Sequence, residues 1–452
     1  MILRTELRRS IAPWAGLALL VVALGFLFLL SGPWWKVPAP WTANTTTTAL
    51  WLRFLLVFLW PIVVGAGAVQ GMRDSRSGMV ELLATTSRPG RHRAIRLAAA
   101  VGLLSALGFL LVFGVGLVEV LAHGGFVSAS FLPVVLVGLL AVVAGSWAGL
   151  AVGRLLPHPL TAPALAVLTL VVSILAWTTL EGAALSMPYS RFGLLAPPLA
   201  QPRGQLVTTA ASVDLGQAVW FAGLAATGFL LLAANSVRAR LLGLLPVVAG
   251  AAIALPVFPA SADGLLVPDG VAAQKVCDGP ICVSRAHEDR LAALAGPGRE
   301  ALAMLAKLPG APSRIEEQMA SASLVSLPAR DPGVVYLNFQ HNEDLLTADA
   351  GTLRLAVLSG AGVPGCVPPS HGDLSDVGAR MIAAAYFTGE LKPLPEYGAK
   401  WVARQPGPIE GAWAKFRALP AEVRFARVAA LRQVLLTCQG DPLETLVPGY
   451  AR

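Results

Sequence analysis

The chain has 452 residues, of which 55% are hydrophobic and only 13% are charged. Its mean hydropathy is +0.66. Soluble globular proteins are about one quarter charged, so this composition excludes an ordinary soluble protein and indicates an integral membrane protein. The formal net charge is +8, yet residues 1–260 hold 16 of the 34 Lys and Arg and only 6 of the 26 Asp and Glu. This positive excess lies in short loops between apolar runs, which argues against nucleic acid as a partner.

Seven apolar runs in the first 260 residues can each cross a bilayer core of about 30 Å, which requires roughly 20 residues. We place them near residues 11–31, 50–70, 97–120, 132–153, 161–180, 217–236 and 242–260. The first is taken as an uncleaved span, because Gly32-Pro33-Trp34-Trp35 offers no small-residue cleavage pattern. The prediction is an all-α polytopic membrane domain with a six-span core over residues 1–240. A seventh helix and a linker occupy residues 241–264.

The basic residues of the connecting segments predict the orientation, because Lys and Arg resist translocation. With the N-terminus inside, the outside loops before residue 260 hold only Lys36, Arg191 and Arg203. The cytoplasmic segments hold twelve arginines: Arg4, Arg8, Arg9, Arg73, Arg76, Arg88, Arg91, Arg93, Arg96, Arg154, Arg238 and Arg240. An odd number of spans then exports everything after residue 260. Arg outnumbers Lys 28 to 6, which we attribute to a GC-rich bacterial genome; the expected location is the bacterial cell membrane.

Residues 265–452 are expected to form a soluble, mainly helical α+β domain. Helices are predicted at 286–295, 300–308, 376–387 and 420–438, and strands at 334–339 and 353–358. All four cysteines lie in this domain, and disulfides persist in oxidising compartments. We predict disulfides between Cys277 and Cys282 and between Cys366 and Cys438, although four cysteines allow three pairings. Zinc held by Cys277, Cys282 and His287 is the alternative, but the spacing matches no common structural site.

The apolar runs contain several features of packed membrane helices. Gly145, Gly149 and Gly153 repeat at four-residue spacing, as do Gly67 and Gly71, which allows helices to approach closely. Arg53 and Glu119 lie near the outer ends of their spans; extension to the lipid headgroups is the preferred interpretation, and mutual pairing or a polar path is the alternative. The outer segment 187–195 is apolar enough to fold back onto the outer leaflet.

The loop between the second and third runs contains an amphipathic pattern. Met79, Leu82 and Leu83 are spaced as on one helix face, which predicts a short helix from Ser77 to Thr86 along the inner membrane surface. Arginines surround this helix, so spacing alone favours anchoring to anionic lipid.

The string Arg76-Ser-Gly-Met-Val-Glu-Leu-Leu-Ala-Thr-Thr-Ser-Arg88 resembles the coupling helix in the permease subunit of type-2 ABC exporters. That family reads approximately Gly-Thr-x-Glu-Leu-Leu-x-Thr-x-x-x-Arg, and its coupling helix docks on the ATP-binding cassette subunit. The likeness covers about 25 residues. It departs from the family because Pro89 follows the Ser-Arg pair, and because Arg93 and Arg96 replace an expected lysine. The resemblance implies a docking role for Gly78, Met79, Glu81, Leu82, Leu83, Thr85 and Arg88.

The resemblance predicts a permease subunit that works as a homodimer or heterodimer with a second permease subunit in the lipid bilayer. The chain contains no Gly-x4-Gly-Lys-Ser/Thr motif, so ATP and Mg are expected on a separate ABC ATP-binding subunit, with no cofactor in this chain. The alternatives are a membrane-anchored receptor or sensor and an anchored exported enzyme. Enzymatic activity is not favoured, because residues 265–452 contain neither a His-Glu-x-x-His nor a Gly-x-Ser-x-Gly motif.

Overall fold

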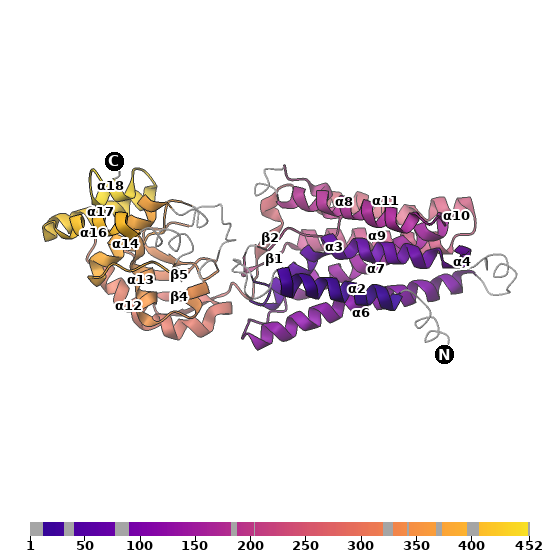
Figure 1. Ribbon diagram of the computed structural model, residues 1–452, viewed down its shortest axis with the longest axis horizontal. Coiled ribbons are helices and arrows are strands. Elements are labelled where there is room, and N and C mark those ends of the chain that lie inside the picture. The colour runs from indigo at the N-terminus through magenta and orange to yellow at the C-terminus, as the bar shows by residue number, and fades with distance from the viewer. Residues whose placement is uncertain are drawn as a thin grey trace. The chain divides into compact units, whose positions relative to one another are not determined.

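The computed structural model describes residues 12–30, 40–76, 90–181, 188–202, 204–319, 329–340, 343–367, 373–395 and 406–450. These residues form two compact units (Figure 1). The helical unit holds the described residues up to 202 together with 207–267, and the C-terminal unit holds 204–206 together with the described residues from 268 onward.

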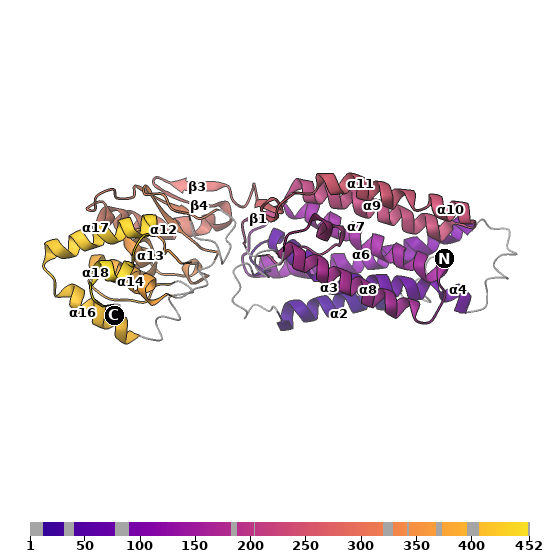
Figure 2. The ribbon, with the colours of Figure 1, turned by 90° about the horizontal axis from the view of Figure 1, so that it is seen from above.

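The helical unit consists of apolar helices joined by short connections. Its elements are α2 (Ala12–Gly25), the π-helix η1 (Phe26–Leu30), α3 (Thr45–Gly71), α4 (Arg73–Arg76), α6 (Gly90–Ala122), α7 (Phe131–Leu155), α8 (Thr161–Glu181), the 3-10 helix η3 (Arg191–Leu195), α9 (Ala211–Ala233), α10 (Val237–Leu242) and α11 (Leu245–Val257). Figure 2 shows α9 and α11 along one side of this unit and α2 along the other.

Six helices among the described residues are long and apolar enough to cross a membrane, with α10 and α11 taken as one span, and Gly16–Leu29 is a shorter apolar helix. The chain is therefore a multi-pass membrane protein by length and composition. The six long helices coincide with the second to seventh predicted runs, whereas the first predicted run corresponds to the shorter helix, which is not among the six. The seventh run is interrupted between α10 and α11, where Pro246 lies in the first turn of α11.

The start of α3 lies five residues before its predicted start at residue 50. Asn44 is the N-cap, and its Oδ1 accepts a hydrogen bond from the Thr47 amide at 2.7 Å. Thr45 and Thr48 are fully buried and donate to the carbonyl oxygens of Ser128 and Trp41. The four threonines have no apolar pattern, so hydropathy alone did not detect this first turn.

The glycines of α3 and α7 allow these two helices to pack closely. A Cβ on Gly149 would overlap the Val64 carbonyl oxygen, and one on Gly67 would overlap the Ser146 carbonyl oxygen. The predicted close-approach role is therefore confirmed, and the contact is within the chain. Small residues at such an interface bring the backbones together where lipid supplies no hydrophobic driving force.

Gly149→Ala is expected to destabilise the helical unit by about 2 kcal/mol, because the added methyl group has no space against the α3 backbone. The measurement is thermal unfolding of the full-length protein in detergent. Gly114→Ala in α6 is the matched control, since a Cβ there meets no atom within 4 Å. Equal effects of the two substitutions would contradict this account.

The connections between the helices lie at the two opposite ends of the helical unit. Helices α3, α7 and α9 finish at one end, which we call the basic end; its described arginines are Arg73, Arg76, Arg96, Arg154, Arg238 and Arg240. At the opposite end lie the connections 122–131 and 188–211 and the end of α11, with Arg191. The chain enters α2 at the basic end and leaves α11 at the opposite end.

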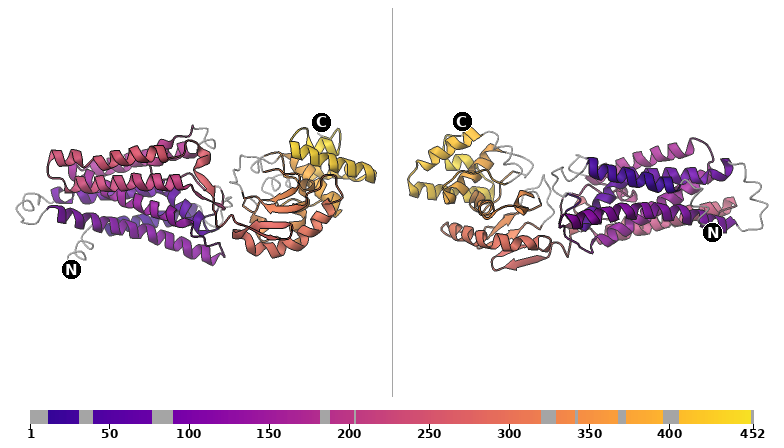
Figure 3. Two further views of the ribbon diagram at one scale, coloured as in Figure 1. Left: turned by 180° about the vertical axis from the view of Figure 1, so that it is seen from behind. Right: turned by 60° about the horizontal axis from the view of Figure 1, so that its bottom comes forward.

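The C-terminal unit is an α+β domain with a four-stranded sheet in the order β3-β4-β5-β6. The strands are β3 (Lys275–Asp278), β4 (Ile281–Ser284), β5 (Arg314–Glu317) and β6 (Val334–Leu337). Strands β3 and β4 are antiparallel, and β4, β5 and β6 are parallel. The helix α12 (Glu288–Leu305) lies along the sheet (Figure 3), with Gly298 against Ile281 and Ile315.

In the described part of this unit, five further helices contribute to the core: α13 (Ala350–Leu358), α14 (Leu374–Thr388), α16 (Pro406–Arg417), α17 (Ala421–Thr437) and α18 (Pro442–Leu446). Two helix predictions, 376–387 and 420–438, correspond to α14 and α17. The predicted strand at 353–358 is wrong, because these residues belong to α13. Leu353, Leu355 and Val357 alternate like a strand, but the Asp349 side chain caps the Thr352 amide and starts a helix. The predicted helices 286–295 and 300–308 form the single helix α12.

Residues 204–206 precede α9 in the chain but belong to the C-terminal unit. The Gln205 amide donates to Oε1 of Gln340 at 2.8 Å, and the Asp269 amide donates to the Leu206 carbonyl oxygen at 2.8 Å. Leu206 and Asp269 are fully buried. The next residues form β1 (Val207–Thr209), which pairs with β2 (Leu266–Pro268).

Candidate functional site

The residues matched to the coupling helix lie in segment 77–89, outside the described residues: Gly78, Met79, Glu81, Leu82, Leu83, Thr85 and Arg88. The chain approaches this segment through α3 and α4 and continues from it into α6. The segment therefore joins the basic ends of two helices that cross the unit. Arg73 and Arg76 of α4 are exposed before it, and Arg96 of α6 is exposed after it.

The helical unit contains a buried polar cluster formed by Arg53, Thr209, Asp214 and Gln217, which we call the Arg53 cluster. Arg53 of α3 is 0% exposed. Its guanidinium donates to the Pro197 carbonyl oxygen at 2.9 Å and to Gln217 Oε1 at 2.5 Å. A longer bond of 3.4 Å reaches the Val134 carbonyl oxygen in α7. Ionisable side chains within membrane segments are costly and mark candidate functional sites.

The segment 188–202, which we call the return segment, is held at this cluster by four successive backbone carbonyls. Gln217 Nε2 donates to the carbonyls of Leu194 at 2.9 Å and Ala196 at 3.2 Å. Trp220 Nε1 donates to Leu195 at 2.6 Å, and Arg53 donates to Pro197. Irregular backbone is tolerated within a membrane protein only where protein groups or a water-filled cavity satisfy it. Side chains of α3 and α9 do so here.

Further contacts fix the return segment at the same end of the helical unit. The Tyr189 hydroxyl donates to the Pro259 carbonyl at 2.9 Å, and the Gln201 amide donates to Glu181 Oε1 at 2.6 Å. Burial raises the pKa of Tyr189, which keeps its hydroxyl a donor. A Cβ on Gly193 would come 3.0 Å from the Ala176 carbonyl oxygen of α8. The segment thus packs against helices instead of lying free on the outer leaflet.

The preferred interpretation of Arg53 from the sequence is wrong. Its guanidinium does not extend to the headgroups, because it is fully buried. Among the described contacts it forms no ion pair with Glu119, which lies 3.6 Å from His123. The cluster partners Asp214 and Gln217 are three residues apart in the first two turns of α9. Two polar residues at this spacing on an otherwise apolar helix were the signal that could have revealed the cluster.

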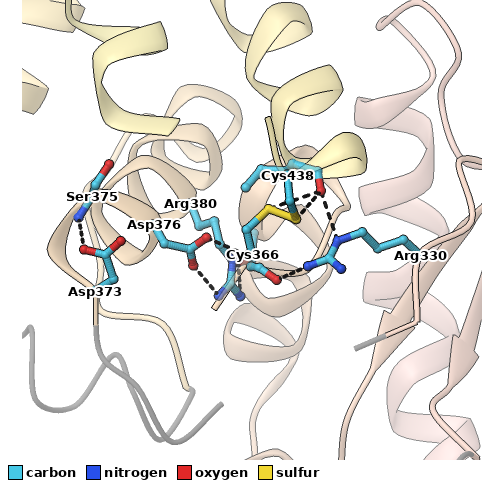
Figure 4. Close-up of polar contacts among 10 residues, drawn as sticks. Arg330, Cys366, Asp373, Ser375, Asp376, Arg380 and Cys438 are labelled. Carbon is cyan, nitrogen blue, oxygen red and sulfur yellow. Dashed lines mark hydrogen bonds and ion pairs between the residues drawn. A yellow bond between two sulfur atoms is a disulfide. The ribbon is translucent and has the colours of Figure 1, made fainter. Parts of the chain in front are cut away.

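Both disulfides form in the predicted pairing, Cys277 with Cys282 and Cys366 with Cys438. The second joins the loop after α13 to the end of α17 and lies among charged side chains (Figure 4). Asp376 Oδ1 accepts the Cys366 amide hydrogen at 2.7 Å, and Arg380 lies 3.6 Å from Oδ2 of Asp376. Arg330 donates to the carbonyls of Leu435 and Gly365. Burial lowers the pKa of Arg330, while Asp376 acts in the opposite direction.

The histidine of the alternative zinc site has other partners. His287 Nδ1 lies 2.7 Å from Glu317 Oε1 and 3.2 Å from the Ser284 hydroxyl. In a Ser-His-acid triad the hydroxyl and the carboxylate meet opposite ring nitrogens, whereas here both meet Nδ1. Within the described ranges, no three His, Cys, Asp or Glu side chains are grouped to hold a metal. This part of the C-terminal unit therefore has the geometry of a buried structural contact.

Comparisons with known proteins do not assign the chain to a family. No protein-family model, curated protein or solved structure shows significant similarity to it.

Proposed function

We propose that this chain is the membrane-spanning permease subunit of an ABC exporter, driven by a separate ATP-binding subunit. The observation that carries the proposal is the position of segment 77–89 in the chain, at the basic end and directly after α3 and α4. A docked ATPase that moves this segment would act on α3. Nearly all of α3 is buried, and it packs along α7 and α8.

The cytoplasmic orientation of the basic end belongs to this proposal. Its support is the unequal distribution of arginines between the two ends of the helical unit, which favours the basic end inside. The C-terminal unit would then lie outside the cell, where its two disulfides are stable.

The mechanism proposed is alternating access. Closure of the ATPase dimer pushes segment 77–89, and α3 transmits the displacement toward Arg53 at its other end. Arg53 contacts α7, α9 and the return segment at once. A shift of α3 would therefore change the packing at the end of the helical unit opposite the ATPase, where substrate would leave.

The test is association with an ATPase. Replacing Leu82 and Leu83 with aspartate should reduce co-purification of an ATP-hydrolysing subunit at least about tenfold, because two buried leucines at a docking face contribute roughly 1.5–3 kcal/mol each. The measurement is ATPase activity recovered with the full-length chain from native membranes in mild detergent. Leu160→Asp is the matched control, since Leu160 is exposed in the 155–161 connection at the same end.

Two outcomes would count against the proposal. Retained association of the double variant would remove the docking role of segment 77–89. Absence of any ATP-hydrolysing partner from the wild-type preparation would favour the membrane-anchored receptor instead.

A further inference from the structure

The Arg53 cluster contains two buried, oppositely charged groups that do not touch. Asp214 of α9 is 8% exposed. It is close enough to Arg53 to interact electrostatically, yet within the described structure the two form no ion pair or hydrogen bond. Arg53 instead binds a neutral amide and backbone carbonyls. This is unusual, because buried charges in proteins are generally paired with an opposite charge.

One oxygen of Asp214 is available for a new partner. Oδ2 accepts a hydrogen bond from the Thr209 hydroxyl at 2.7 Å. Oδ1 is buried, and no group among the described residues binds it. A buried carboxylate oxygen without a hydrogen bond costs free energy, so the observed arrangement leaves a stabilising interaction unmade.

The Arg53 side chain occupies a space that α7 leaves open. A Cβ on Gly138 would come 2.8 Å from Arg53 Cδ. Glycine at this position therefore lets the guanidinium lie between α3, α7 and α9, within the electrostatic reach of Asp214.

We propose that Arg53 is a latch with two positions. In the position described, it holds the Pro197 carbonyl and Gln217 and keeps the return segment closed against the helices. When the return segment moves away, the guanidinium loses Pro197 and pairs with Asp214 Oδ1. The ion pair offsets the cost of leaving a buried cation without its carbonyl partner, which lowers the free energy of the open arrangement.

The two side chains next to Arg53 then have opposite effects on the closed state. Asp214 favours opening because it stabilises Arg53 in the open position. Thr209 opposes opening because its hydroxyl holds the carboxylate in its present place. If the cluster had only a structural role, loss of either side chain would loosen it. Both substitutions would then increase the exposure of the return segment.

The experiment measures exposure of the return segment in the purified full-length protein. Leu199, which is 5% exposed, is replaced by cysteine. No native cysteine in the structure is free, so a polar maleimide reports this position. Asp214→Asn should slow the labelling about tenfold, the population shift expected from losing one charge-assisted hydrogen bond. Thr209→Val should accelerate it, and Asp214→Glu should remain close to the wild-type rate.

The control is Phe192→Cys, which is 65% exposed and should label at one rate in every background. Faster or unchanged labelling of Leu199→Cys with Asp214→Asn would overturn the latch. If Asp214→Asn does not fold, Thr209→Val decides alone, and slower or unchanged labelling overturns the proposal. The measurement uses the chain without an ATPase, so its result is independent of the proposed energy source.

Discussion

Replacing Cys366 and Cys438 together with serine should lower the free energy of unfolding of the C-terminal unit by about 4 kcal/mol. The disulfide joins positions 72 residues apart, and a link across a long loop removes much of the conformational entropy of the unfolded chain. The measurement is proteolysis of the full-length chain over a urea series, following cleavage within the C-terminal unit.

The other disulfide is an internal control for this result. Cys277 and Cys282 are separated by five positions, so their replacement should cost only about 2 kcal/mol in the same entropic treatment. Equal losses from the two pairs would show that local contacts decide the stability and not loop length. The Asp376 carboxylate accepts a hydrogen bond from the Cys366 backbone amide. This contact does not involve the sulfur atom, so the serine substitution retains it.

Arg432→Met should destabilise the C-terminal unit by at least about 3 kcal/mol. Arg432 of α17 is 1% exposed. Its guanidinium donates to the backbone carbonyls of Ala361 at 2.7 Å, Pro332 at 2.5 Å and Gly310 at 3.1 Å. Methionine fills much of the volume but removes the donor from all three carbonyls, and the carbonyl of the fully buried Ala361 is then left without its partner. Burial lowers the pKa of Arg432, because the charged guanidinium loses its contact with water.

Gln433→Met is the matched control for this substitution, because Gln433 is exposed on the same helix. It should change the stability by no more than about 0.5 kcal/mol. Arg432→Lys should recover only part of the loss, since a lysine amine cannot reproduce the planar set of donors. Full recovery by lysine would mean that the charge matters and the three carbonyl contacts do not.

The membrane-spanning helices were predicted well because hydropathy along the sequence is sufficient to detect them. A run of about 20 apolar residues has few alternatives to a helix in lipid, and the six long apolar helices lie within a few residues of predicted runs. The errors are at polar ends, as in the threonine turn after Asn44. Side-chain caps and tertiary hydrogen bonds decide those boundaries, and hydropathy does not include them.

The polar interior was predicted poorly for a related reason. Arg53 was recognised as unusual, but its partners come from α7, α9 and the return segment, up to 164 positions away. A pattern of local spacing contains no information on such contacts. The preferred disulfide pairing was correct, although the sequence alone could not choose among the three connectivities that four cysteines allow. In contrast, residues 353–358 of α13 were assigned as a strand because their apolar residues alternate, and the N-cap at Asp349 that starts the helix lies outside that stretch.

The participation of residues 204–206 in the C-terminal unit limits how this domain can be transplanted. A fragment that starts after α11 would lack Gln205 and Leu206, which bond to Gln340 and Asp269. A fusion of this fragment to another membrane helix would therefore lack part of the domain. During synthesis, Gln205 can form its bond to Gln340 only after more than a hundred further residues have been made. Folding of the C-terminal unit therefore depends on a segment that lies before α9 in the chain.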